Sequence, residues 1–135
     1  MKLLVIGGTR FVGRHLVDAA LARGDSVTLF NRGQTPASLP PGVALIRGDR
    51  RADLAALAGQ RWDAVVDCCG YLPSEVASMA EALDTRVDRY VFISSVSVYG
   101  SFATPNHEGS ALGHIDDADT TVVDGRTYGP LKALC

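Results

Sequence analysis

Residues 3–13 read LLVIGGTRFVG, and this stretch decides how the chain folds. A short apolar run passes directly into glycines, and a pattern of helical spacing follows over residues 11–23. A strand that turns sharply into a helix needs glycine for unusual dihedral angles, for close approach of a ligand, and for packing of helix on strand. The N-terminus of such a helix attracts anions, so residues 7–13 are predicted to bind a phosphate group.

The rest of the chain repeats this alternation of strand and helix. Strands are predicted over residues 2–6, 26–30, 43–47, 63–68 and 89–94, and helices over 11–23, 52–58, 73–83 and from residue 128 onward. Residues 33–42 and 101–126 are predicted loops. Parallel pairing through right-handed crossovers then gives an α/β, Rossmann-like doubly wound sheet with strand order 3-2-1-4-5.

Residues 1–135 are therefore expected to form one NAD(P)-binding domain. The helical pattern still continues at Cys135, although a doubly wound fold of this kind usually adds at least one more strand. We expect the chain to be the first part of a larger protein, without the last strands and the substrate-binding part. A sheet edge or apolar face left uncovered in this way would favour a homodimer.

Composition excludes several functional classes. With 47% hydrophobic residues the chain is too apolar to be disordered, and 135 residues leave room for one ordinary domain. The net charge of −2 gives no basic excess for nucleic acid or an anionic membrane, and no apolar run is long enough to span a bilayer. Three cysteines, two of them adjacent, are a poor disulfide framework and favour a reducing cytoplasm. The predicted loop 101–126 is rich in acidic residues but lacks the spacing of metal ligands, so no metal site is expected.

Polar residues after the second predicted strand indicate which dinucleotide is bound. NAD-selective sites usually carry a carboxylate there, but this chain has Asn31 and Arg32. Arg10 and Arg32 can bond a 2′-phosphate as forked donors, and Asn31 can bond a hydroxyl or a phosphate. The sequence therefore favours NADP over NAD, the alternative being two solvated surface arginines.

Two further candidates follow the third predicted strand. Asp49 is placed either to bond the adenine amino group or to cap the helix predicted over 52–58. Strand ends in this topology face the ligand crevice, which favours the cofactor contact for Asp49 and for its neighbour Arg50.

A Ser, Tyr and Lys constellation lies late in the chain. The last predicted strand runs into the serine-rich stretch 94–97, and Tyr128 and Lys132 are four residues apart on one helix face. An ammonium beside a phenol favours the phenolate, so Tyr128 can exchange a proton with a substrate hydroxyl or carbonyl. A serine hydroxyl would orient that oxygen, and Lys132 can also bond the nicotinamide ribose.

These motifs resemble the extended and atypical short-chain dehydrogenase/reductases, the NAD(P)-dependent epimerase/dehydratase group. The resemblance rests on the motifs VIGGTRFVG, FNRG, GD after the third strand, VFISSVSVYG and YGPLK. It implies hydride transfer to or from a small carbonyl or hydroxyl substrate, with Ser95, Tyr128 and Lys132 as catalytic residues. It also implies that Cys68, Cys69 and Gly70 lie against the cofactor.

One departure from the family pattern opens an alternative. Arg10 stands where a central glycine is expected, as in an atypical branch that resembles chloroplast stem-loop RNA-binding proteins. The alternative function is a non-catalytic dinucleotide-binding or RNA-associated module, although the chain has no basic surface excess for nucleic acid. The candidate cofactor-binding residues are Gly7, Gly8, Thr9, Arg10, Phe11, Val12, Gly13, Asn31, Arg32, Asp49, Arg50, Cys68, Cys69, Gly70 and Lys132.

Overall fold

The structure is a computed structural model that describes residues 1–35 and 38–135. Its strands and helices are β1 (Lys2–Ile6), α1 (Phe11–Ala22), β2 (Ser26–Asn31), β3 (Ala44–Arg47), the 3₁₀ helix η1 (Leu54–Leu57), β4 (Ala64–Asp67), α2 (Pro73–Leu83), β5 (Tyr90–Phe92), the 3₁₀ helix η2 (Val96–Val98) and α3 (Tyr128–Leu134). The chain divides into two compact units. We call Met1–Cys69 with Ser78–Ile93 the sheet unit, and Gly70–Ala77 with Ser94–Cys135 the loop unit.

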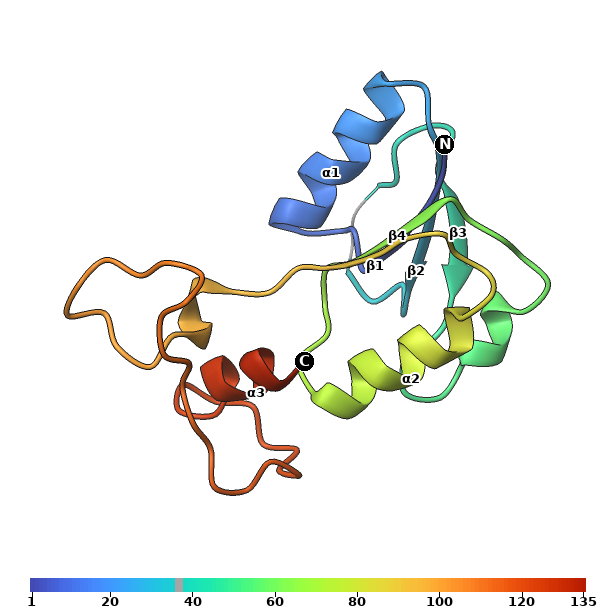
Figure 1. The fold of residues 1–135 in the computed structure, drawn as a ribbon. Helices are drawn as coiled ribbons and strands as arrows, with labels where there is room; N and C mark the ends of the chain where they lie inside the picture. Colours follow the sequence, from blue (N-terminus) through green and yellow to red (C-terminus); the bar gives the residue numbers. More distant parts are fainter. Residues whose placement is uncertain (36–37) are drawn as a thin grey trace. The chain divides into compact units, whose positions relative to one another are not determined.

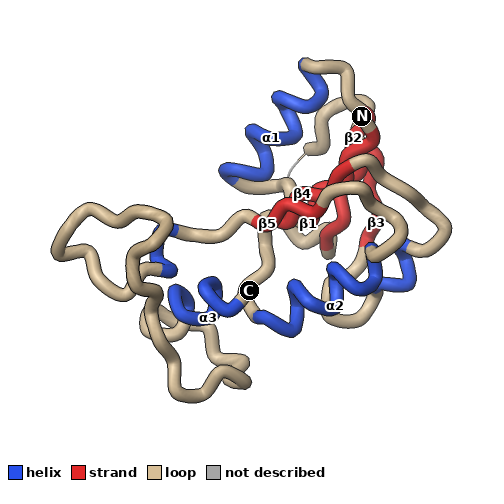
Figure 2. Tube along the Cα trace, in the orientation of Figure 1, coloured by secondary structure: helices blue, strands red, loops and turns tan. Residues whose placement is uncertain are grey.

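All five strands form one parallel sheet with the order β3-β2-β1-β4-β5, which confirms the predicted topology (Figures 1 and 2). β1 lies between β2 and β4, and Ile6 at its end pairs with Phe30 and Asp67. The order of the strands reverses on either side of β1, and ligands in open α/β sheets bind at the carboxyl ends of strands at such a point. The turn that follows Ile6 therefore lies where ligands of such sheets bind.

Both faces of the sheet are buried. Leu4 and Ile6 of β1 belong to one apolar cluster, while Leu3 and Val5 belong to the other. The first cluster also contains Leu57, Met79 and Leu83 from η1 and α2, and the second contains Val17 and Ala20 from α1. Figure 1 shows α1 on one side of the strands and α2 on the other. Burial on both faces explains why the strands read as continuous apolar runs and do not alternate with polar residues.

Five predicted elements are shorter than expected: α1, β3 and β4 by one or two residues, and η1 and β5 by three. The helix predicted over 52–58 is the 3₁₀ helix Leu54–Leu57, which ends close to Gly59 at a φ of +77°. A segment of four residues forms only one turn, and 3₁₀ helices are typically this short. The strand predicted over 89–94 is Tyr90–Phe92, because its neighbour β4 ends at Asp67 and the last bond between them runs from the Ile93 N–H to the Asp67 carbonyl.

The loop unit contains little regular structure. Residues 101–126 hold no helix or strand, as predicted, and the final helix begins at Tyr128, also as predicted. The loop returns on itself at an isolated bridge between Tyr99 and Leu112, where the Gly113 N–H donates to the Val98 carbonyl at 2.7 Å. The 3₁₀ helix η2 was not predicted, and the Ser95 hydroxyl caps it by accepting the Ser97 N–H at 3.1 Å.

Within the described ranges 1–35 and 38–135, no helix has both the length and the apolar character needed to cross a bilayer. The predicted loop 33–42 includes Pro36 and Ala37, which lie outside the described residues.

Candidate functional site

The turn after β1 has the backbone geometry that its glycines predict. Gly7 and Gly8 have φ values of +94° and +80°, a region that L side chains rarely adopt. A Cβ added to Gly8 would lie 2.6 Å from Leu29 Cδ2, and one added to Gly13 would lie 2.8 Å from the Cα of Gly8. The first turn of α1 thus packs directly on the turn that follows β1, an approach that a side chain at Gly13 would block.

The start of α1 is open toward solvent. Arg10 is the N-cap with extended backbone, and its side chain makes no capping hydrogen bond. Phe11 follows with a φ of +21° and an 80% exposed side chain. The first N–H groups of a helix without a capping side chain carry positive partial charge and can donate to a phosphate. The cradle made by Gly7, Gly8 and Gly13 therefore fits a dinucleotide pyrophosphate.

The Asn31 side chain at the end of β2, predicted to bond a hydroxyl or a phosphate of the cofactor, makes two hydrogen bonds to the backbone. Its Nδ2 donates to the Gly7 carbonyl at 3.0 Å, and its Oδ1 accepts the Gly33 N–H at 2.8 Å. The side chain thereby fixes the turn after β1 to the loop after β2. Arg10 and Arg32 are exposed, one on each of these two segments.

Asp49 does not cap the following 3₁₀ helix. Its Oδ1 accepts the Arg51 N–H at 2.9 Å, whereas the N-cap of η1 is Asp53, whose Oδ2 accepts the Asp49 N–H at 2.8 Å. The two carboxylates thus hold a tight turn directly after β3. Of the two roles proposed for Asp49, the capping role is absent, and the cofactor contact stays a prediction.

Arg50 forms a buried ion pair that the sequence did not predict. Its Nη1 and Nη2 donate to the two carboxylate oxygens of Asp67 at 2.8 and 2.7 Å, and both side chains are buried. Asp67 also accepts the Tyr90 hydroxyl at 2.7 Å and the Cys69 N–H at 3.1 Å. These bonds hold the loop after β3 and the start of β5 to Asp67 at the carboxyl end of β4. The sequence signal was a carboxylate at the end of the apolar run AVVD.

Electrostatics favour the charged pair. Burial alone would raise the pKa of Asp67, but the hydrogen bonds and charge of Arg50, with the hydroxyl of Tyr90, hold that pKa below its usual value. The pKa of Tyr90 is raised by its burial and by the neighbouring Asp67 charge, so its hydroxyl stays protonated and donates. Asp67 is therefore an ionised carboxylate with fixed donors around it.

The Asp67 cluster also orients the residues that follow β4. Because the Cys69 N–H donates to Asp67, the chain turns there, and Cys69 comes close to the turn after β1. A Cβ added to Gly7 would lie 3.3 Å from the Cys69 sulfur and 3.9 Å from Cys68 Cβ. Cys68 and Cys69 therefore lie beside the glycine turn, and the cofactor contact that the resemblance implies for them stays a prediction.

In the loop unit, α3 carries Tyr128 and Lys132. Lys132 is only 5% exposed, and its Nζ donates to the Gly70 carbonyl at 2.9 Å. The Tyr128 ring centroid lies 6.2 Å from that of Tyr71, and the Lys132 Nζ lies 6.0 Å from the same Tyr71 ring. The Ser95 side chain caps η2. Lys132 and Tyr128 thus both lie next to the segment after β4, Lys132 through its bond to Gly70 and both residues through the Tyr71 ring.

Two residues of the loop unit were missed by sequence reasoning. Gly129 allows α3 to approach η2, since a Cβ there would overlap the Ser97 carbonyl oxygen. Glu75 is buried in the first turn of α2, and its Oε2 accepts the N–H groups of Tyr71 and Leu72 at 3.0 and 3.3 Å. Its spacing of three residues from Leu72 was the available signal for a capping carboxylate.

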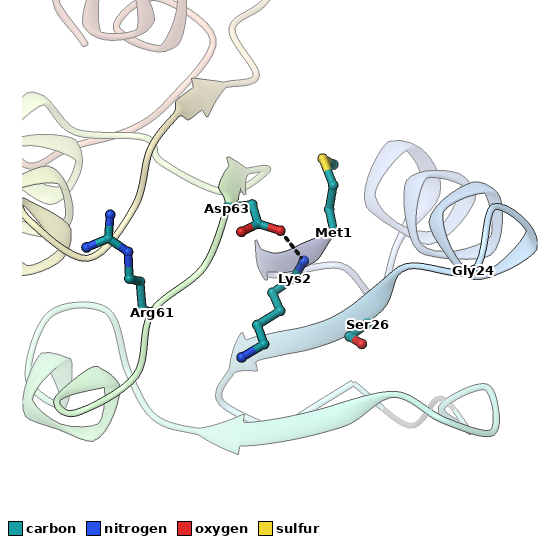
Figure 3. A pocket seen from close by; sticks show the side chains of 6 residues that line it. All are labelled: Met1, Lys2, Gly24, Ser26, Arg61 and Asp63. Atoms are coloured by element: carbon teal, nitrogen blue, oxygen red, sulfur yellow. Dashed lines mark hydrogen bonds between the residues drawn. The ribbon is translucent and has the colours of Figure 1, made fainter.

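A surface hollow lies at the other end of the sheet (Figure 3). It is lined by Met1, Lys2, Gly24, Ser26, Arg61 and Asp63, near the starts of β1, β2 and β4. The Lys2 N–H donates there to Asp63 at 2.7 Å. Ligands of open α/β sheets bind at the carboxyl ends of the strands, so this hollow is separate from the candidate site.

Two proteins of named function are similar to this chain in sequence. The chain is 34% identical over 114 residues to the chloroplast stem-loop binding protein of 41 kDa b of Arabidopsis thaliana, covering 73% of this chain and 30% of that protein. It is 35% identical over 115 residues to the 2'-dehydrokanamycin reductase of Streptomyces kanamyceticus, covering 82% of this chain and 32% of that protein. The chain thus spans about a third of the length of these relatives.

Solved structures agree with the fold. MoeE5 in complex with UDP-glucose and NAD matches with a TM-score of 0.73 at 26% identity, covering 99% of this chain and 46% of that one. A UDP-glucose 4-epimerase matches with a TM-score of 0.75 at 22% identity, covering 98% of this chain and 44% of that one, and supports the fold. The model of the NAD dependent epimerase/dehydratase family matches residues 3–121. The chain belongs to the NAD dependent epimerase/dehydratase family.

Proposed function

We propose that the chain binds NADP as part of an oxidoreductase or epimerase of the short-chain dehydrogenase type. The observation that carries the proposal is the glycine turn, where Gly7 and Gly8 adopt positive φ and Gly13 packs on Gly8 at the uncapped start of α1. This backbone fits a pyrophosphate and leaves no room for side chains at these positions. MoeE5, a relative by structure, is described in complex with NAD.

In this proposal the N–H groups of residues 7–13 hold the pyrophosphate, with Thr9, Phe11 and Val12 beside it. Asp49 bonds the adenine, and the backbone around Cys68, Cys69 and Gly70 lies along the cofactor. The buried Arg50 acts indirectly, because its guanidinium is bonded to Asp67. Through this ion pair Arg50 holds the loop after β3 against the end of β4, where the cofactor would bind.

The choice of NADP depends on Arg10 and Arg32. Both side chains are exposed, on the segments that Asn31 ties together, and the described end of β2 offers no carboxylate for a ribose hydroxyl. Two guanidinium groups there would attract the 2′-phosphate. We expect Arg32→Ala to weaken NADP binding about tenfold, corresponding to loss of a charge-assisted bond of roughly 1.4 kcal/mol, with NAD binding changed less than twofold.

For the reaction, Tyr128 is the proton donor and acceptor at the substrate oxygen, and Ser95 orients that oxygen. A bound nicotinamide would supply the hydride chemistry. Lys132, also proposed to bond the nicotinamide ribose, places positive charge near Tyr128, where it would stabilise the negative charge that develops on the phenol oxygen during proton transfer. One relative is described as a 2'-dehydrokanamycin reductase, and MoeE5 is described in complex with UDP-glucose and NAD. We therefore propose that the substrate is a ring-bearing carbonyl or hydroxyl compound.

Fluorescence titration with NADP and NAD tests the cofactor proposal directly. Gly13→Val should abolish binding by separating α1 from the glycine turn, while Ala22→Val, at an exposed position of the same helix, should leave it unchanged. Binding of NADP by Gly13→Val with unchanged affinity, or tighter binding of NAD than NADP by the wild type, would contradict the proposal.

NADPH oxidation with a panel of keto sugars tests the reaction in the intact protein. Tyr128→Phe should remove turnover and leave cofactor affinity within a few-fold, because the phenol proton is used in chemistry and the ring adds little to dinucleotide binding. Turnover retained near the wild-type rate would remove Tyr128 from the mechanism.

A second candidate function is a non-catalytic module that contacts RNA. It is favoured by the 34% identity to a protein described as a stem-loop binding protein. Against this candidate, the chain has a net charge of −2 and therefore no general attraction for phosphate backbones. Gel-shift titration with a stem-loop RNA separates the two candidates, since the oxidoreductase proposal expects no binding at physiological salt.

A further inference from the structure

We propose that Tyr71 is a positioning residue, whose ring and the neighbouring Gly70 carbonyl hold the Lys132 ammonium in place beside Tyr128. The four residues come from two segments far apart in the sequence, the loop before α2 and the helix α3. Figure 1 shows the C-terminal end of α3 next to the start of α2, and the hydrogen bond from Lys132 to Gly70 joins α3 to the loop before α2.

The Lys132 side chain is held at its charged end. Its Nζ donates to the Gly70 carbonyl at 2.9 Å, and the residue is only 5% exposed. A lysine ammonium carries three donors on a flexible stem, so a second group that attracts it restricts its direction beyond what one carbonyl does.

The Tyr71 ring is that second group. The Lys132 Nζ lies 6.0 Å from the ring centroid, within the range of a cation–π interaction. The same ring lies 6.2 Å from the Tyr128 ring, with 46° between their planes. One aromatic ring therefore contacts both members of the proposed proton-transfer pair.

Tyr71 is itself held by the backbone around it. Its N–H donates to Glu75 Oε2 at 3.0 Å, and the N–H of Leu72 donates to the same oxygen at 3.3 Å. Glu75 is buried, so this carboxylate fixes the loop before α2 against the first turn of the helix. The Tyr71 ring, which is 44% exposed, thus extends from a backbone of fixed geometry.

The consequence for catalysis rests on the proposed function. If Tyr128 exchanges the proton, a displaced Lys132 ammonium would no longer stabilise the negative charge that develops on the Tyr128 oxygen during the transfer, and turnover would fall while substrate affinity stayed the same. The position of the ammonium itself can be tested without any substrate.

The sequence supplies an internal control, because Lys2 and Lys132 are its two lysines. Lys2 is exposed and belongs to the sheet unit. In the 135-residue chain labelled with ¹⁵N-lysine, we expect ring protons of Tyr71 to show nuclear Overhauser contacts with the ε-methylene of Lys132. Absence of these contacts in the folded wild type would overturn the proposal, and this measurement needs no substitution.

Two variants then separate the ring from the hydroxyl. Tyr71→Leu should increase the rate of Lys132 acylation by an N-hydroxysuccinimide ester at least fivefold and shift its ammonium resonance, with Lys2 unchanged. Tyr71→Phe keeps the ring and should stay within twofold of the wild type. Equal Lys132 acylation in wild type and Tyr71→Leu, or a Tyr71→Phe variant that behaves like Tyr71→Leu, would overturn the proposal. NADP titration of the same samples tests the proposed function separately, because a failure to bind cofactor leaves the lysine result unaffected.

Discussion

The sheet unit and the loop unit keep their candidate functional residues in place by different physical means. In the sheet unit, apolar clusters on both faces of a parallel sheet hold the glycine turn at the end of β1. In the loop unit, polar bonds and close backbone contacts hold α3, such as the bond from Lys132 to Gly70 and the approach of Gly129 to Ser97. Burial of apolar area is nondirectional, whereas hydrogen bonds and close contacts depend on individual atoms. Single substitutions should therefore affect the two units differently.

The largest effect should come from the buried ion pair of Arg50 with Asp67. Arg50→Ala leaves the Asp67 carboxylate buried without its bidentate partner and should lower the free energy of unfolding by about 3–5 kcal/mol. Chemical denaturation followed by circular dichroism measures this loss. The exposed Arg89→Ala removes the same charge and should cost less than about 0.5 kcal/mol. Equal effects of the two variants would show that the buried pair contributes no stability.

The next effect concerns the close contact in the loop unit. In an ordinary helix Gly→Ala is favourable by about 1 kcal/mol, but a Cβ at Gly129 would overlap the Ser97 carbonyl oxygen. Gly129→Ala should therefore destabilise α3 by about 1–3 kcal/mol. Hydrogen exchange should show faster exchange in residues 128–135, with β1 and β4 unchanged. Gly125→Ala, where a Cβ meets no atom within 4 Å, is the matched control. Slower exchange in α3 of the Gly129→Ala variant would contradict the close packing of Gly129 on the Ser97 carbonyl.

The smallest effect should appear as a pH dependence. The pKa of Asp67 is lowered in the folded protein, so its contribution to stability is complete above its unfolded pKa of about 3.9. That contribution is lost as the pH falls from about 4 through the folded pKa. The difference in unfolding free energy between wild type and Asp67→Asn should therefore shrink below pH 4. Asp25 and Asp124 also have lowered pKa values, so both proteins keep some acid sensitivity. A difference that is constant from pH 3 to 7 would argue against an ionised Asp67.

The sequence predicted much of the sheet unit because its signals are local. The strand order, the glycine turn and α1 follow from short apolar runs, from glycine spacing and from the right-handed crossover rule. The start of α3 at Tyr128 was predicted for the same reason, since Pro130 in the first turn marks a helix start. The lengths of η1 and β5 were predicted less well, because η1 forms only a single 3₁₀ turn and β5 extends only as far as its pairing with β4.

Interactions between distant residues could not be predicted in the same way. Arg50 and Asp67 are 17 residues apart, and Lys132 and Gly70 are 62 residues apart. Nothing in the local pattern around Arg50 distinguishes a guanidinium that reaches a cofactor from one that turns into the sheet. The partner of Arg50 depends on the burial of Asp67, and that burial arises only when β4 lies between β1 and β5.

The sequence by itself determined the parallel sheet, its strand order and the positions where a phosphate can approach the backbone. These features depend on hydrophobic periodicity and on the steric freedom of glycine, which are properties of a residue and its immediate neighbours. Tertiary structure alone decided that Asp67 gathers Arg50, Tyr90 and the Cys69 N–H, and that Tyr71 faces both Lys132 and Tyr128. A buried polar group must find its partners wherever the fold brings them, and the direction of such a bond is set by geometry across the whole chain.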